Sequence, residues 1–305
     1  MNIMERIKKG PSKLPARIMM IGVEGVGKST AGAAMPNPIF VCGENGLVGD
    51  QFGDVNSFNP SSWAEVIEFV DELAKNANGF QSIVIDTLDW LEPLLYQHVV
   101  AKANKKDIQN IEDFGYGRGY VLAQSEARQL LARLDRLNRN GFGVLILAHS
   151  QIKTFNNPNG ENFDRYEPKV NLKIGGLFRE WCDCVLFAEF DMYTEKDGQR
   201  YKAFGGQNRI VHTTHSSAWD AKNRYGLPEI MPLYMPTILA AIEKGHPDDG
   251  SVLGELKALL PKLPEDKANA VTEWLKKERT PQQIAGLLNK CRFEIQQNNR
   301  QQEAA

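Results

Sequence analysis

The chain of 305 residues has a hydrophobic fraction of 42%, a charged fraction of 24% and a net charge of −2. This is the composition of a folded globular protein, and it excludes disorder, collagen-like repeats and low-complexity fibres. The near-neutral charge balance also excludes a wholly basic nucleic-acid coat, so any DNA contact has to come from local patches. Four cysteines are too few for a disulfide scaffold. No apolar run reaches the roughly 20 residues of a membrane helix, so we expect no membrane association. The charged N-terminus has no apolar segment behind it, and we expect no signal peptide and a reducing cytoplasm.

Hydrophobic patterning from residue 17 onward predicts strands that alternate with helices. The expected strands are 17–21, 39–42, 81–86, 143–148 and 184–188. The expected helices are 28–34, 62–75 and 120–138. Ser62 and Glu65 have the spacing of a capping box at the start of the second helix. Near-continuous apolar strands between helices are typical of a mostly parallel sheet covered on both faces, so we predict an α/β fold.

The alternation breaks between Lys153 and Lys173, where about 20 residues of Asn, Pro, Gly and charge predict a long loop. Gly175 and Gly176 are expected to open the next helix, and 201–211 indicates a hairpin. The composition shifts near residue 245, after which three short helical segments are expected. The predicted divisions are a basic arm, a core, a small helical C-terminal domain and a polar tail, at 1–15, 16–245, 246–295 and 296–305.

The strongest motif is Gly22-Val-Glu-Gly-Val-Gly-Lys28-Ser29, which matches GxxxxGK[ST] between an apolar strand and a helix. Its glycines let backbone N–H groups curl around a polyphosphate, and the helix N-terminus adds partial positive charge. Lys28 can reach the β- and γ-phosphates, and the Ser29 hydroxyl can bind Mg²⁺. We therefore predict that ATP is bound by the consecutive residues Gly22, Val23, Glu24, Gly25, Val26, Gly27, Lys28, Ser29 and Thr30.

Carboxylates follow two further strands. Asp86 ends the run Ser82-Ile-Val-Ile-Asp86, where it can hold Mg²⁺ through water or else cap the next helix. Glu44 follows the strand 39–42, where it would polarise the attacking water or else be a solvated turn residue. For Asp89, three residues after Asp86, we favour a structural role.

The strand 143–148 is followed by His149-Ser150-Gln151. Polar groups at that position can contact the γ-phosphate and couple its presence to the conformation of the loop that follows. Alternatively, they are ordinary polar residues at the exposed end of a strand. For His149, a structural hydrogen bond and a catalytic role fit the sequence equally well.

In chain order, the phosphate loop, Glu44, Asp86, Gln151 and the Gly-Gly helix resemble the core of RecA-type recombinases. Late in the chain, Ala221-Lys222-Asn223-Arg224 resembles the Lys-Asn-Lys segment of that family, whose cations reach the nucleotide of the neighbouring subunit. More narrowly, residues 16–235 resemble the phage-encoded RecA-like ATPases of the Sak single-strand annealing group.

The resemblance implies a RecA-like P-loop NTPase fold, a homo-oligomer and an ATPase that uses ATP with Mg²⁺. It gives Glu44 the role of general base, Gln151 that of γ-phosphate sensor and Lys28 that of the phosphate-binding cation. Lys222 and Arg224 become catalytic cations that act on a neighbouring subunit, while Ser29 and Asp86 hold the metal. If the chain is phage-encoded, the expected compartment is the host cytoplasm.

The resemblance also assigns DNA binding to the loop over 152–174. This loop combines cations for phosphates with aromatic rings for base stacking, which are the two ingredients of single-strand binding. The candidate DNA contacts are Lys153, Phe155, Arg165, Tyr166, Lys169 and Lys173. Three acidic residues dilute the charge, and an ordinary surface loop is the alternative.

Two further motifs are ambiguous. Cys182-Asp-Cys184 lacks a second pair of ligands for zinc, so we expect buried cysteines at a strand end. The run from Phe114 to Tyr120 contains three glycines and Arg118, and it is either a substrate loop or a plain turn.

These patterns together predict a DNA-stimulated ATPase that acts on single-stranded DNA in homologous recombination or strand annealing. A single-strand-binding protein is a candidate partner. One alternative is an ATP-gated clamp or loader that switches a protein partner. A small-molecule phosphotransferase is less favoured because we find no Arg-rich lid and no acceptor site.

Overall fold

The computed structural model describes residues 14–43, 47, 49, 52–197, 200–244, 256, 259–260, 263–275, 287, 290–291 and 295. The chain divides into two compact units, Met1–Ile242 and Glu243–Ala305. The second unit contains the helix α8 (Glu265–Leu275) and a small buried cluster around Leu256 and Val271. All of the predicted ligand contacts fall in the first unit. Within the described part of the chain, no helix is both long and apolar enough to cross a membrane.

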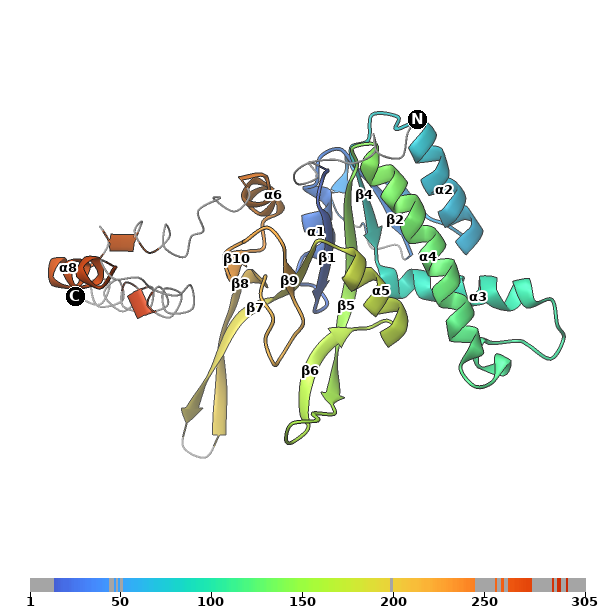
Figure 1. Cartoon of the computed structure of the whole chain (residues 1–305). Helices are drawn as coiled ribbons and strands as arrows, with labels where there is room; N and C mark the ends of the chain where they lie inside the picture. The colour runs from blue at the N-terminus through green and yellow to red at the C-terminus, as the bar shows by residue number, and fades with distance from the viewer. Residues whose placement is uncertain are drawn as a thin grey trace, which may run out of the picture. The chain divides into compact units, whose positions relative to one another are not determined.

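A mixed, mostly parallel sheet forms the centre of the first unit (Figure 1). Its strands are β1 (Arg17–Gly22), β2 (Pro38–Cys42), β3 (Asn56–Phe58), β4 (Ser82–Asp86), β5 (Gly143–Phe155), β6 (Phe163–Pro168), β7 (Cys184–Asp197), β8 (Arg200–His212), β9 (Lys222–Asn223) and β10 (Ile230–Pro232). The strand order is β10-β8-β7-β1-β5-β4-β2-β3, with parallel pairing from β7 to β3. Strands β8 and β10 extend the sheet in antiparallel pairing.

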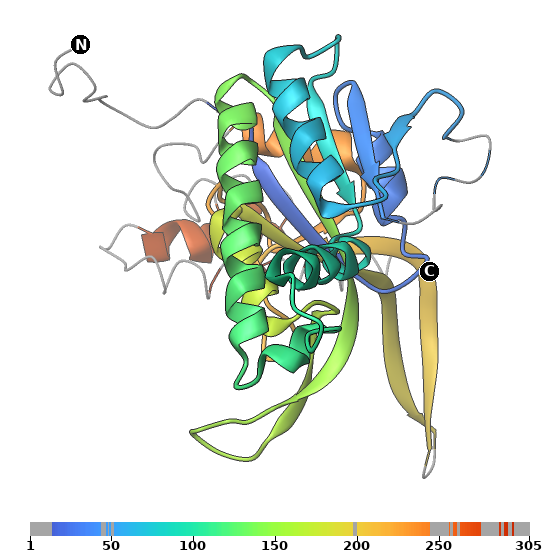
Figure 2. The same cartoon turned by 90° about the vertical axis from the view of Figure 1, so that its right-hand side faces the viewer.

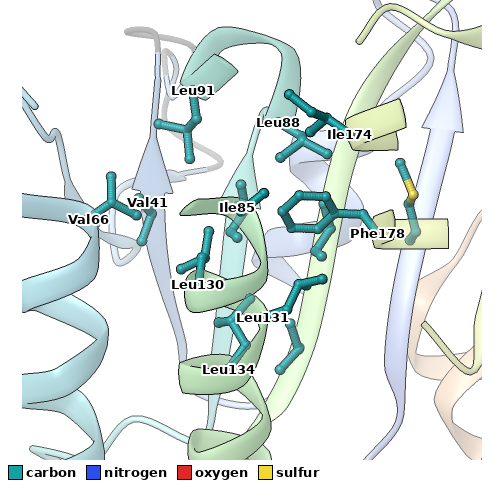
Figure 3. Close-up of a cluster of buried hydrophobic side chains, with 14 of the residues drawn as sticks. Val41, Val66, Ile85, Leu88, Leu91, Leu130, Leu131, Leu134, Ile174 and Phe178 are labelled. Carbon is teal, nitrogen blue, oxygen red and sulfur yellow. The ribbon is translucent and has the colours of Figure 1, made fainter. Parts of the chain in front are cut away.

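Helices cover both faces of this sheet, which confirms the α/β prediction. They are α1 (Lys28–Ala33), α2 (Trp63–Lys75), α3 (Leu88–Ala103), α4 (Arg118–Arg139), α5 (Leu172–Trp181) and α6 (Met235–Lys244), with a short 3₁₀ helix η3 (Ile111–Phe114). Apolar residues of α2 to α5 pack on one face, and those of α1 and α6 pack on the other. Figure 3 shows Leu88 of α3, Leu131 of α4 and Phe178 of α5 gathered around Ile85 of β4.

The prediction of a long loop over 152–174 is wrong. Strand β5 continues to Phe155 and pairs antiparallel with β6, from Ser150 opposite Pro168 to Phe155 opposite Phe163. The hairpin projects beyond the core, so its strands show little of the hydrophobic alternation that reveals a half-buried strand. The hydrogen bonds between its strands join backbone groups, so no side-chain pattern in the sequence indicates them.

Two helix starts and one capping box also differ from the expectation. Helix α5 begins at Leu172, where the Asn171 side chain accepts a hydrogen bond from Lys173 N, so the two glycines lie inside the helix. Helix α4 begins at Arg118 rather than Tyr120. The Ser62 side chain caps α2 as predicted, but the Glu65 carboxylate accepts from Ser61 N and Oγ, so the capping box is not reciprocal.

Two hairpins project from the same edge of the sheet (Figures 1 and 2). Strand β1 lies between β5 and β7, and both of these neighbours run beyond its end to pair with β6 and β8. The pairing of β7 with β8 confirms the hairpin predicted at 201–211. Gly22, the last residue of β1, is in register with His149 on β5 and Ala188 on β7. The loop that follows Gly22 therefore starts between the bases of the two hairpins.

Cys182 and Cys184 are buried, as predicted, next to the start of β7. Burial raises the pKa of Cys184 to about 12, so its thiol stays protonated at neutral pH. Both thiols therefore act as small apolar groups of the core.

Candidate nucleotide-binding site

The turn from β1 into α1 has the backbone geometry of a phosphate loop. Gly25 and Gly27 have φ angles of 71° and 102°, which side-chain-bearing residues rarely adopt. At Gly22, an added Cβ would lie 2.6 Å from the carbonyl oxygen of Ala188, so the close approach of β1 to β7 requires glycine. The motif glycines are thus used for left-handed backbone and for tight packing.

Lys28 is the first residue of α1, and its side chain folds back over the loop. It is 5% exposed, and Nζ donates to the carbonyl oxygens of Gly22 at 3.1 Å and Val23 at 2.9 Å. An ammonium held over the loop is positioned to meet the phosphates that the loop would cradle.

The two predicted metal-binding residues lie together. Asp86 ends β4, is 4% exposed, and accepts a hydrogen bond from the Ser29 hydroxyl. Burial raises the pKa of Asp86, against the opposing effects of this hydrogen bond and of the Lys28 charge. A hydroxyl and a carboxylate beside the phosphate loop are hard oxygen ligands, so these residues fit Mg²⁺.

Asp89 and His149 form a pair at the same edge of the sheet. The Asp89 carboxylate accepts from the backbone N–H of His149 at 2.9 Å and lies 2.8 Å from its Nδ1. Burial alone would raise the pKa of Asp89, but the hydrogen bonds from His149 outweigh it and hold that pKa below its usual value. The sequence indicated both residues but not their contact.

The predicted γ-phosphate sensor lies further along β5. Gln151 Nε2 donates to the carbonyl oxygen of Pro168 at 3.0 Å, which joins the two strands at the base of the β5–β6 hairpin. Glu44, the predicted general base, lies outside the described residues. Both roles stay predictions.

Lys222 and Arg224 lie at the opposite edge of the sheet. Strand β9 pairs with Cys184 and Val185 at the beginning of β7, Lys222 Nζ donates to the Glu180 carbonyl at 2.8 Å, and Arg224 contacts Asp183 at 3.0 Å. Burial lowers the pKa of Lys222, and the nearby charge of Arg224 lowers it further. The six residues of β1 span about 17 Å, so neither cation is near the phosphate loop of its own chain. Both cations make structural contacts in their own chain, and their predicted contact with the nucleotide of a neighbouring subunit stays a prediction.

Of the six candidate DNA contacts, Arg165 is buried and the other five are exposed or half-buried. Lys153, Lys169 and Lys173 are exposed, and Phe155 is half-buried against Phe163 with ring centroids 5.2 Å apart. Arg165 is buried and forms an ion pair with Asp220. The Tyr166 ring packs on Phe187 at 4.9 Å. Arg165 is therefore a structural contact, whereas Tyr166 is half-buried like Phe155 and its DNA contact stays a prediction.

Arg209 is a residue that the sequence did not indicate. An added Cβ at Gly27 would lie 3.0 Å from its Nη1, so this guanidinium of β8 lies against the phosphate loop. A hollow of about 90 Å³ beside it is also lined by Thr30 and Tyr234. Because the contact depends on the register of β8 against β7, no local pattern could have revealed it.

The Gly-rich run before α4 is a turn in which Tyr116 is fully exposed at φ 47°, between Gly115 and Gly117. Arg118 is exposed at the start of the helix. A role for these residues in binding a substrate stays open.

The fold and the site define an α/β P-loop NTPase fold. The phosphate loop follows β1. Strand β4, which ends in Asp86, is separated from β1 by β5, and helices cover both faces of the sheet. The chain belongs to an AAA domain family, which it matches over residues 14–225. A comparison with curated proteins gave no match.

Among solved structures, the chain is similar to the crystal structure of the RadB recombinase. The identity is 14% and the TM-score 0.36, and the match covers 68% of this chain and 84% of the other.

Proposed function

We propose that this protein binds and hydrolyses ATP and acts on single-stranded DNA in phage-type homologous recombination or strand annealing, like the Sak group it resembles. The observation that carries the proposal is the cluster of Lys28, Ser29 and Asp86, at the same edge of the sheet from which the β5–β6 hairpin projects. In this proposal, the nucleotide site lies beside β5, the strand that continues into the hairpin proposed to bind DNA.

In this proposal, the phosphate loop binds the polyphosphate through its backbone N–H groups and Lys28. Ser29 and Asp86 hold Mg²⁺, which neutralises charge on the phosphates when it is bound. Asp86 is buried, which keeps bulk water from competing with the metal for its carboxylate. Glu44 is proposed as the base for the attacking water.

The proposed reaction also needs a second copy of the chain. Lys222 and Arg224 lie too far from their own phosphate loop to contact its nucleotide, which favours a homo-oligomer in which they reach the next subunit's ATP. An arginine supplied by a neighbouring subunit can raise turnover by roughly 10³- to 10⁵-fold. We therefore expect slow hydrolysis by the isolated subunit.

The proposed DNA contacts are Lys153, Phe155, Lys169 and Lys173, on and beside the β5–β6 hairpin. Three exposed cations can neutralise phosphates, and the half-buried ring of Phe155 is the candidate for base stacking. The protein would act in the cytoplasm, that of the host if it is phage-encoded, with a single-strand-binding protein as the candidate partner.

The proposal is tested by measuring ATP hydrolysis with and without single-stranded DNA, with Lys28→Ala as the control. Stimulation by DNA that disappears in the variant supports it. Hydrolysis that depends on Lys28 but ignores DNA contradicts the DNA part and favours the switch for a protein partner. Hydrolysis that increases linearly with protein concentration, at a constant rate per subunit, contradicts the role of the neighbouring subunit.

A further inference from the structure

The contact between Asp89 and His149 joins two segments that flank the nucleotide site. Asp89 lies in the first turn of α3, directly after the Asp86 strand end, and His149 lies on β5. The carboxylate makes two contacts to one residue, at 2.9 Å to the backbone N–H and at 2.8 Å to Nδ1. Their side chains are only 7% and 15% exposed, so the imidazole is fixed in one orientation.

His149 also has a definite place along the edge of the sheet. It is in register with Gly22, where the phosphate loop begins, and β5 separates that strand from the strand of Asp86. His149 therefore lies on the strand between the one that leads into the phosphate loop and the one that ends in the metal-binding carboxylate.

The imidazole is not needed to anchor the strand. The backbone N–H of His149 already donates to Asp89, and its carbonyl oxygen accepts from Lys169 N at 2.7 Å. Any residue other than proline at position 149 could keep both of these bonds. The second contact, through Nδ1, orients the ring and leaves Nε2 as the ring atom available for a ligand.

We propose that His149 contacts the γ-phosphate of bound ATP through Nε2, and that Asp89 is the positioning residue that holds the imidazole for this contact. The inference rests on the proposed ATP binding and deepens it, because it says how the site distinguishes ATP from ADP. Gln151, the sensor expected from the sequence, donates its amide to Pro168, whereas His149 lies at the end of the sheet beside the loop.

The test is equilibrium binding of fluorescent ADP and of a fluorescent, non-hydrolysable ATP analogue to the full chain. We expect His149→Ala to weaken binding of the ATP analogue about tenfold, the loss of one hydrogen bond to a charged group, and to leave ADP binding unchanged. His149→Gln should recover part of the loss because its amide can donate to a phosphate oxygen. Asp89→Asn should give an intermediate loss for the ATP analogue alone.

His98→Ala is the matched control, because His98 faces a carboxylate of Glu126 at 3.6 Å on a different part of α3 and α4. It should leave both affinities unchanged. An equal loss for ATP analogue and ADP in His149→Ala, or no loss at all, overturns the inference while the ATP-binding proposal stands. If the wild-type chain binds neither nucleotide, both proposals fail together.

Discussion

Arg224 Nη1 contacts the Asp183 carboxylate at 3.0 Å, at the edge of the sheet opposite to the phosphate loop. The same carboxylate accepts from Arg17 at 2.8 and 2.9 Å, so Asp183 keeps a partner when Arg224 is removed. The Arg224 side chain is 56% exposed, which makes it available to another subunit and dispensable for folding.

Arg224→Ala should therefore lower ATP turnover by roughly 10³-fold or more and leave nucleotide binding unchanged. A mixture with Lys28→Ala gives the sharper measurement. Some subunit pairs would then combine an intact phosphate loop from one variant with an intact Arg224 from the other, and part of the activity should return. A mixture no more active than its separate components would contradict the assignment.

The exposed cations of the β5–β6 hairpin should set the salt dependence of single-stranded DNA binding. Lys153→Ala should weaken binding and reduce the slope of log affinity against log salt by about 0.7, the value for one phosphate contact on a single strand. Lys75→Ala is the control, because Lys75 pairs with Glu72 on the surface of α2. Equal slopes for wild type and Lys153→Ala would exclude this lysine from the DNA contact.

Asp220 should stabilise the fold in a pH-dependent manner. Burial alone would raise its pKa, but its hydrogen bond with Arg165 and the charge of Arg179 outweigh that effect and lower the pKa. The stabilisation is therefore complete above the unfolded-state value of about 3.9 and is lost as the pH falls through the folded-state pKa below it.

Asp220→Asn should lower the free energy of unfolding by about 2 kcal/mol at pH 7, because Arg165 is only 7% exposed and loses its carboxylate. Urea unfolding followed by circular dichroism should show this difference shrinking below about pH 4. Glu72→Gln, in an exposed ion pair, should have almost no effect at either pH. A difference for Asp220→Asn that persists undiminished at pH 3 would contradict the ion-pair explanation.

Two helical glycines should respond oppositely to alanine. At Gly32 of α1, an added Cβ would lie 2.9 Å from both Phe40 and Val84, so Gly32→Ala should destabilise the fold by about 1–3 kcal/mol. At Gly176 of α5, no atom lies within 4 Å of the added Cβ, so Gly176→Ala should stabilise by up to about 1 kcal/mol through helix propensity. Thermal unfolding of both variants measures the two effects. Shifts of the same sign in the unfolding midpoint would contradict the described packing of α1 on the sheet.

The parts of the fold that sequence reasoning predicted are those with local or periodic causes. The phosphate loop was predictable because its glycines and Lys28 are fixed by one continuous motif, and Asp86 because it ends a fully apolar strand. The β5–β6 hairpin was missed because exposed strands are held by backbone hydrogen bonds, which no side-chain pattern records. The Asp89–His149 contact joins residues 60 apart, and it depends on the direction in which α3 leaves the sheet.

The continuity of β5 has a mechanical consequence. From Ala148 to Phe155 the strand covers about 23 Å, so a polymer bound at the hairpin tip would be well separated from the γ-phosphate. A polymer bound at the tip would then influence the nucleotide without touching it, whereas Lys169 lies at the base of the hairpin, where its N–H donates to the His149 carbonyl. If β5 rotated at His149, the tip of the hairpin would move further than the residues beside the nucleotide, because the tip lies further from the point of rotation.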